Sequence, residues 1–150
     1  MSQREQPWSD QRAEQGRILV LSDNPISRAI ESIATTVGRE VVVEPDDDGG
    51  PGLAPRAGDA VVLCDHDAPD VPSVLRAALG SEAAYVAMMA SRRRASATVA
   101  ELREEGVDVT TLHVPAGHDL GGKGPGEIAL SVIAEIVAES YGRTGGSMRD

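Results

Sequence analysis

The feature that most constrains the fold of this chain is a regular alternation of short aliphatic runs with longer amphipathic segments. The aliphatic runs have the length and the Val, Leu and Ile content of buried strands, and the longer segments carry apolar residues at helical spacing. The predicted strands are residues 17–22, 40–44, 59–65, 83–89 and 108–114, and the predicted helices are residues 25–38, 70–80, 91–106 and 124–140. Such alternation predicts a three-layer, Rossmann-like α/β fold, in which a doubly wound and mainly parallel sheet of about five strands has helices on both faces.

The length of the chain and its scarcity of aromatic residues agree with this fold. A chain of 150 residues favours one domain with a modest core. Aromatic residues make up 2% of the sequence and Phe is absent, so small aliphatic side chains must fill the core. We expect residues 17–141 to form the domain, residues 1–16 to be a flexible N-terminal arm and residues 142–150 to be a disordered tail, because both ends are polar and lack periodicity.

The charge of the chain argues against several classes of partner. With 24 acidic and 14 basic residues, the formal net charge is −10, and such a surface repels nucleic acid and anionic membranes. No apolar run is long enough to span a bilayer, and residues 1–16 lack a signal-peptide core. Cys64 is the single cysteine, so no internal disulfide is possible, and we expect a cytoplasmic location.

Four loops that follow predicted strands carry most of the polar and glycine-rich chemistry. Because the carboxyl ends of parallel strands meet at one edge of a sheet, these loops are predicted to converge where such folds bind ligands. The loops are "SDNPIS" (22–27), "CDHD" (64–67), "ASRRR" (90–94) and "HVPAGHDLGGKGPGE" (113–127).

The first loop lies where a dinucleotide-binding fold has its glycine-rich turn. Ser22 and Asn24 stand at the first two glycine positions, and their side chains fill space that a pyrophosphate needs. An NAD(P) site is therefore the less favoured interpretation, although Glu44 lies at about the spacing of a ribose-binding acid. A helix capped by Asp23 or Asn24 is the favoured one.

The second loop places a thiol, two carboxylates and an imidazole in four residues. This spacing is not one of the recognised metal-ligand patterns, so a metal site is disfavoured. We expect Cys64 to pack in the core, and His66 and Asp67 to hydrogen-bond neighbouring loops or a ligand.

The third loop offers Ser91 as a helix N-cap, followed by Arg92, Arg93 and Arg94. Arginines oppose the helix dipole in a first turn, and they are explained if a bound anion neutralises them. The alternative is that they are solvated and paired with Glu101, Glu104 or other surface acids.

The fourth loop combines glycines, charged residues and histidines in front of a helix. The glycines are expected to adopt unusual backbone angles, the charged residues to make polar contacts, and the histidines to be ligands, proton carriers or simply solvated. These residues are Gly117, Gly121 and Gly122, then Asp119 and Lys123, then His113 and His118. Pro125 is predicted to open the last helix and Glu127 to support its first turn.

Three of these segments resemble the XdhC/CoxI family. "AYVAMMASRRR" resembles the family's Y-I-G-x-x-G-S-R-R-R segment, "LCDHD" matches its T-H-D stretch, and "VPAGHDLGGKGPGEIALSVIAEI" is similar to its P-x-G-L-D-I-G-A-x-T-P-E-E-I-A-x-S-I-x-A-E-I segment. The three occur in the same order, and the similarity covers residues 17–140. It corresponds to the family's C-terminal Rossmann-like domain, and the family's N-terminal domain has no counterpart in the sequence.

The resemblance implies an accessory role rather than an enzyme. Family members bind molybdenum cofactor, support its sulfuration and deliver it to molybdenum hydroxylases of the xanthine dehydrogenase and carbon monoxide dehydrogenase type. The implied ligand is molybdopterin or its nucleotide form, and the implied partner is the apo-enzyme or an assembly protein. The cofactor-binding residues that the resemblance implies are Ser91, Arg92, Arg93, Gly117, Asp119, Gly121 and Glu127, with His66 and Asp67. We add Lys123 as a candidate binding residue, because its charge is suited to polar contact in the glycine-rich loop.

The sequence departs from the family pattern at several of these positions. Ala87 and Ala90 replace glycines, His118 replaces a leucine and Gly126 a glutamate. Two alternatives therefore stay open: a nucleotide-binding, oxidoreductase-like Rossmann domain, and a ligand-free interaction module that forms a homodimer or binds a partner.

Overall fold

Five strands pair side by side in one sheet, and every neighbouring pair is parallel. The computed structural model describes residues 15–44, 54–65, 67 and 71–149. The strands are β1 (Ile18–Leu21), β2 (Val41–Glu44), β3 (Ala60–Leu63), β4 (Tyr85–Met88) and β5 (Leu112–His113), in the spatial order β2-β1-β3-β4-β5. The order reverses between β1 and β3, as the predicted doubly wound topology requires.

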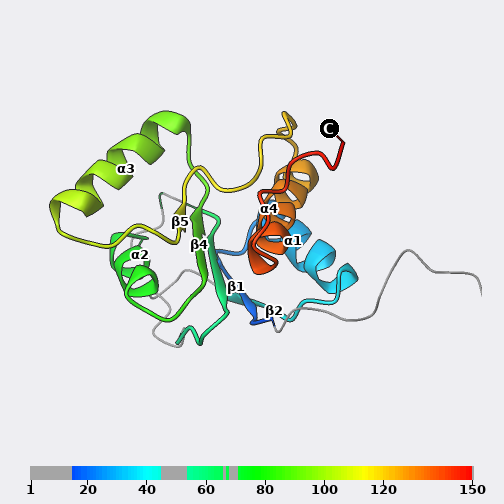
Figure 1. The fold of residues 1–150 in the computed structure, drawn as a ribbon, viewed down its shortest axis with the longest axis horizontal. Coiled ribbons are helices and arrows are strands. Elements are labelled where there is room, and N and C mark those ends of the chain that lie inside the picture. The colour runs from blue at the N-terminus through cyan, green and yellow to red at the C-terminus, as the bar shows by residue number, and fades with distance from the viewer. Residues whose placement is uncertain (1–14, 45–53, 66, 68–70, 150) are drawn as a thin grey trace, which may run out of the picture.

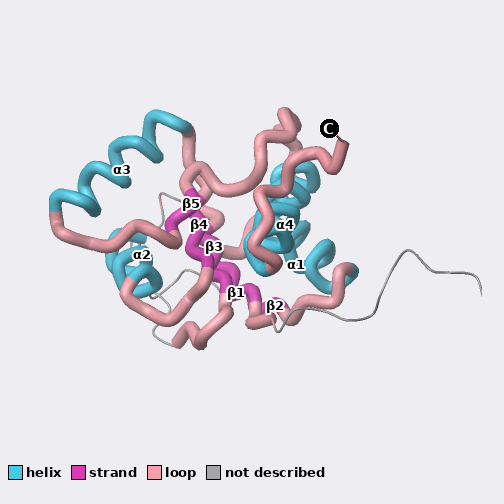
Figure 2. Tube along the Cα trace, in the orientation of Figure 1, coloured by secondary structure: helices cyan, strands magenta, loops and turns pink. Residues whose placement is uncertain are grey.

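Four helices cover the two faces of the sheet (Figures 1 and 2). They are α1 (Pro25–Thr36), α2 (Val71–Leu79), α3 (Arg92–Glu104) and α4 (Pro125–Ser140). α1 and α4 pack on one face, and α2 and α3 pack on the other. The predicted three-layer α/β fold is therefore confirmed.

Alternate residues of each buried strand divide between two aliphatic cores. Val20 and Val62 face α1 and α4, whereas Leu19 and Val61 face α2 and α3. Because both faces are covered, the central strands consist almost entirely of apolar residues. Tyr85 is the single aromatic side chain in the two clusters.

The last strand is shorter than the sequence predicts. Residues 108–114 were expected to be extended, but only Leu112 and His113 pair with β4. The carboxylate of Asp108 accepts hydrogen bonds from the backbone N–H of Thr110 (2.9 Å) and from its hydroxyl (2.5 Å), and Leu112 N–H donates to the Val109 carbonyl (3.0 Å). This Asx turn removes the first half of the expected strand.

The helices begin at the residues that the sequence indicates. Asn24 caps α1, Ser91 caps α3, and Pro125 opens α4 after Gly124. In the part of the chain that the structure describes, no helix combines the length and apolarity needed to cross a bilayer. The parallel sheet brings the loops after β1, β3, β4 and β5 to one edge, as predicted.

Candidate functional site

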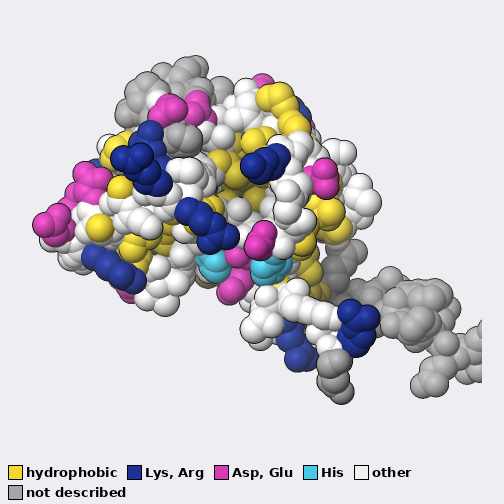
Figure 3. Space-filling view, turned by 90° about the horizontal axis from the view of Figure 1, so that it is seen from above, with side chains coloured by type: hydrophobic (Ala, Val, Ile, Leu, Met, Phe, Trp, Pro, Cys, Tyr) yellow, Lys and Arg dark blue, Asp and Glu magenta, His cyan; other side chains and the backbone are white. Residues whose placement is uncertain are grey.

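A hollow of about 640 Å³ opens at the carboxyl edge of the sheet. Figure 3 looks onto this edge and shows basic side chains bordering a depression with an apolar floor. The volume lies in the range typical of small-molecule sites. Its walls are the loop after β4 (Met89–Arg92), the loop after β5 (Pro115–Lys123), and Ile26, Ile128 and Ser131 from α1 and α4. The arginine segment and the glycine loop, 20 or more residues apart in sequence, thus face the same space.

The start of α3 supplies one wall of the hollow. The Ser91 hydroxyl accepts a hydrogen bond from the Arg94 N–H at 3.1 Å, which confirms Ser91 as the N-cap. Arg94 turns away and contacts Asp67 at 3.2 Å, so one of the three arginines is paired on the surface. Both Arg92 and Arg93 are exposed, but only Arg92 lines the hollow. Neither Arg92 nor Arg93 has a carboxylate partner among the described residues.

The loop after β5 forms the opposite wall. Glycine is favoured at three positions of this loop for two different physical reasons. Gly117 and Gly121 have positive φ angles of 97° and 88°, which favour glycine. The φ angle of Gly122 is not in that region, so the expectation of an unusual angle there is wrong. A Cβ at Gly122 would instead lie 2.8 Å from the Cβ of Glu127, which the helix holds in place, so this close approach favours glycine.

Six of the ten predicted binding residues line the hollow: Ser91, Arg92, Gly117, Asp119, Gly121 and Lys123. Three others lie outside it. Arg93 is exposed and does not line it, Asp67 pairs with Arg94, and Glu127 lies against Gly122 in the first turn of α4. The tenth, His66, is outside the described residues.

The charged side chains of the hollow favour an anionic ligand. Arg92 and Lys123 contribute two positive charges and Asp119 one negative charge, in a chain whose net charge is −10. The apolar floor, formed by Ile26, Met89 and Ile128, is suited to a ring system rather than to a second charge.

Behind the loop, Glu135 of α4 joins three elements through its carboxylate. Oε1 accepts hydrogen bonds from the Tyr85 hydroxyl (2.5 Å) and the Gly117 N–H (3.0 Å), and Oε2 lies 3.5 Å from Nδ1 of His113. Burial opposes ionisation, but hydrogen bonds from His113, Tyr85 and Gly117 lower the pKa of Glu135 to about 2. The same carboxylate raises the pKa of His113 above its usual range.

His118 is fixed over the hollow by backbone and side-chain contacts. Its N–H donates to the Ser131 carbonyl at 3.1 Å, and its imidazole lies against Gly145 of the C-terminal segment. Nε2 of His118 is buried and has no hydrogen-bond partner in the described structure. Since a Cβ at Gly145 would lie 2.3 Å from Nε2, this nitrogen is covered by the C-terminal segment and is not open to the hollow.

The turn after β1, by contrast, closes the position where a dinucleotide would bind. Oδ1 of Asn24 accepts hydrogen bonds from the N–H groups of Ile26 and Ser27, both at 3.0 Å, and Asn24 Nδ2 donates to the Cys64 carbonyl at 3.2 Å. The side chain of Ser27 in turn accepts from the Asn24 N–H at 2.8 Å. This capping box uses the N–H groups of α1 that a pyrophosphate would need.

Cys64 and the acidic residues near it do not form a metal centre in the described structure. Cys64 is 5% exposed and packs in the core below α1 and α4, as predicted. Burial raises the pKa of its thiol to about 12, so the side chain is a neutral apolar group at neutral pH. The described residues contain no group of three His, Cys, Asp or Glu side chains that could hold a metal ion.

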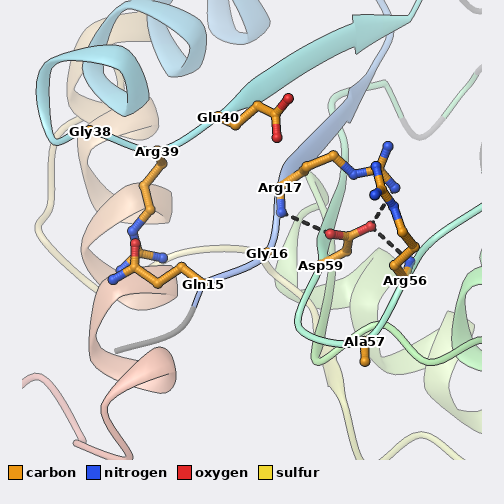
Figure 4. A pocket seen from close by; sticks show the side chains of 9 residues that line it. All are labelled: Gln15, Gly16, Arg17, Gly38, Arg39, Glu40, Arg56, Ala57 and Asp59. Carbon is orange, nitrogen blue, oxygen red and sulfur yellow. Dashed lines mark hydrogen bonds and ion pairs between the residues drawn. The ribbon is translucent and has the colours of Figure 1, made fainter. Parts of the chain in front are cut away.

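A second hollow, of about 480 Å³, lies at the opposite, amino edge of the sheet (Figure 4). Arg17, Arg39 and Arg56 line it together with Asp59. The Asp59 carboxylate, 2% exposed, accepts hydrogen bonds from the Arg17 N–H (2.8 Å), the Arg17 guanidinium (2.6 Å) and the Arg56 N–H (2.8 Å). Arg39 donates to the Ser140 hydroxyl at 2.9 Å. These contacts join chain segments, so we assign this edge a structural role.

Sequence reasoning missed the apolar floor and the carboxylate behind the loop. Ile26, Met89 and Ile128 look like ordinary core residues in the sequence. Glu135 is separated from Tyr85 by 50 positions and from Gly117 by 18. No spacing in the sequence indicates that this helix face packs against the loop.

The fold and the site define a Rossmann-like α/β domain with a polar hollow at the carboxyl edge of its sheet. This chain belongs to the XdhC family, because the model of the XdhC Rossmann domain matches residues 18–136. A relative from Escherichia coli, described as the uncharacterized protein YqeB, is 40% identical over 68 residues, which are 43% of this chain and 13% of that protein. A crystal structure from Bacillus halodurans, described as a xanthine dehydrogenase, matches with a TM-score of 0.70 at 20% identity. That match covers 89% of this chain and 45% of the other, so this chain spans less than half of either protein.

Proposed function

We propose that this domain binds a phosphate-bearing cofactor of the molybdopterin type and assists the maturation of a molybdenum hydroxylase. The single observation that carries the proposal is the placement of Arg92 and Lys123 on the walls of one hollow, above an apolar floor. Membership of the XdhC family supports the pathway. The crystal structure described as a xanthine dehydrogenase shares the fold of this chain.

The donors present fit such a ligand. A phosphate group takes hydrogen bonds from guanidinium, ammonium, hydroxyl and backbone N–H groups, and Arg92, Lys123, Ser91 and the start of α3 offer all four. The ring system would lie on Met89 and the neighbouring aliphatic side chains.

When bound, the cofactor supplies the molybdenum-ligating dithiolene that the client enzyme needs. The residues of this chain bind and orient the cofactor. Arg92 and Lys123 hold the phosphate end, and the glycines let the loop backbone approach the ligand closely. Because the Cys64 thiol is buried and protonated, the proposal gives it no covalent role.

Calorimetric titration of the purified protein with molybdopterin, and with its nucleotide form, tests the proposal. Arg92→Ala should raise the dissociation constant about tenfold, since it removes a charged hydrogen-bond donor. Arg93→Ala is the matched control, because Arg93 is adjacent, equally charged and outside the hollow. Equal effects of both substitutions, or no binding by the wild type, would contradict the proposed ligand.

The same titration with NAD and NADP separates the alternative. No binding is expected, because the capping box already uses the N–H groups of α1. Saturable binding of either dinucleotide, without binding of molybdopterin, would favour a nucleotide-dependent oxidoreductase instead.

A further inference from the structure

The carboxylate of Glu135 connects the core of the domain to one residue of the hollow. Its partners Tyr85 and His113 lie on neighbouring strands, with ring centroids 4.4 Å apart in a stacked arrangement. The side chains of Glu135 and His113 are 13% and 21% exposed. Of the three groups that contact this carboxylate, only the Gly117 N–H belongs to the wall of the hollow.

The backbone around Gly117 is held against α4 at two successive residues. The Gly117 N–H donates to Glu135, and the His118 N–H donates to the Ser131 carbonyl. A Cβ at Gly117 would collide with the Ser131 side chain, which shows how closely the loop approaches the helix. Gly121, farther along the loop, has no atom within 4 Å of its Cβ position and is not held in this way.

Burying a carboxylate costs desolvation free energy that its contacts in a core need not recover. Replacing such groups with apolar residues of similar size is often neutral or stabilising, so their presence points to a geometric role. Here the carboxylate holds the Gly117 amide, whereas the N–H groups of Ala116 and His118 on either side donate to the Met88 and Ser131 carbonyls.

We propose that Glu135 is the positioning residue of the hollow, fixing the Gly117 amide and thereby the wall against which the ligand binds, and that this amide responds to the protonation state of His113. The identity of the ligand in this inference rests on the proposed function. The coupling of Glu135, His113 and the Gly117 amide does not depend on it. The groups acting on His113 are Glu135 and Glu139, both from α4, and the stacked phenol of Tyr85 from β4. A proton on His113 strengthens its contact with Oε2 and changes the charge shared with the Gly117 N–H.

Amide NMR spectra of the free protein, recorded from about pH 5 to about pH 8, where histidine titrates, test the structural part. The Gly117 amide should shift along the His113 titration curve, and the Gly121 amide is the control that should not. His113→Gln should abolish the shift. Glu135→Gln should also abolish it while keeping Gly117 in place, because an amide oxygen still accepts its hydrogen bond. A Gly117 amide that does not follow His113 would overturn the inference, whether or not any ligand binds.

Titration with molybdopterin tests the functional part. Glu135→Ala should raise the dissociation constant about tenfold, because a mobile wall must be ordered on binding. Glu135→Gln should restore the wild-type value. If Glu135→Ala proves too unstable, Tyr85→Phe gives the second comparison, since it weakens the core contact but leaves the Gly117 hydrogen bond. Wild-type affinity in Glu135→Ala would overturn the positioning role, whereas absence of wild-type binding would overturn only the proposed ligand.

Discussion

Ser22, the first residue after β1, has a backbone conformation that its side chain does not favour. Its φ angle is 80°, and it is the single non-glycine residue with a positive φ among the described residues. The position corresponds to the first glycine of a dinucleotide-binding turn, so the chain keeps the backbone turn while replacing the glycine. Ser22 is 4% exposed, and its backbone N–H donates to the Glu44 carbonyl at 3.0 Å.

Substitutions at Ser22 should therefore rank by their tolerance of a left-handed backbone. Ser22→Val should lower the free energy of unfolding by about 2 kcal/mol, because a branched Cβ is strained at positive φ. Ser22→Gly is the control and should unfold close to the wild type, since relief of strain offsets the lost side chain. Urea unfolding of the three proteins measures the difference. A Val variant as stable as the Gly variant would contradict the strained conformation.

Among the elements, those defined by local signals were predicted well. α3 begins at Arg92 because Ser91 caps it, and α1 begins at Pro25 after Asn24, both readable from residue type. β5 was predicted too long because an Asx turn at Asp108 competes with extension. The contact between Glu135 and Gly117 could not be predicted, because it depends on how α4 packs against the loop after β5, and no periodic pattern in the sequence specifies that packing.

Asp59 joins two elements at the amino edge. Burial alone would raise the pKa of this carboxyl, but hydrogen bonds from the Arg17 side chain and from the N–H groups of Arg56 and Arg17 lower it. The contacts connect the start of β1 to the segment that enters β3, and these strands pair in register from Ile18 and Ala60.

Asp59→Ala should lower the free energy of unfolding by about 3 kcal/mol, because it leaves Arg17 and two N–H groups without their acceptor. Thermal unfolding followed by circular dichroism measures the loss. Asp23→Ala is the control: Asp23 also pairs with an arginine, at 2.6 Å, but on an exposed surface, where such a pair contributes little. Equal losses in the two variants would show that burial does not matter to the Arg17–Asp59 pair.

For the molecule as a whole, the two edges of the sheet have different roles. The amino edge contains contacts between chain segments, whereas the carboxyl edge leaves Arg92 and Lys123 facing a hollow. Glu135 links the carboxyl edge to the core, so the same side chain affects both the stability of the domain and the shape of the hollow at that edge. The predicted homodimer and the cytoplasmic location stay predictions at this scale.

This linkage predicts how the stability of the domain depends on pH. The pKa of Glu135 is about 2 in the folded protein and below its usual value, so its contribution is present above the ordinary carboxyl range and is lost as pH falls toward 2. Asp59, whose pKa is also lowered, acts in the same direction. The pKa of His113 is raised, so its contribution is present below its ordinary pKa and is lost as pH rises through the raised value. Stability should therefore be greatest between these limits.

Melting temperatures measured across the pH range test this profile. The wild type should lose stability on both sides of a maximum in weakly acidic solution. His113→Gln should flatten the alkaline side, because the histidine proton no longer contributes, and should also reduce the acid loss, because His113 is one of the groups that lower the pKa of Glu135. Glu135→Gln should flatten both sides, since the carboxylate titrates on the acid side and also raises the pKa of His113, which acts on the alkaline side. If His113→Gln kept the full alkaline loss, another group would be its cause, and the coupling of His113 to Glu135 would be too weak to bear on the hollow.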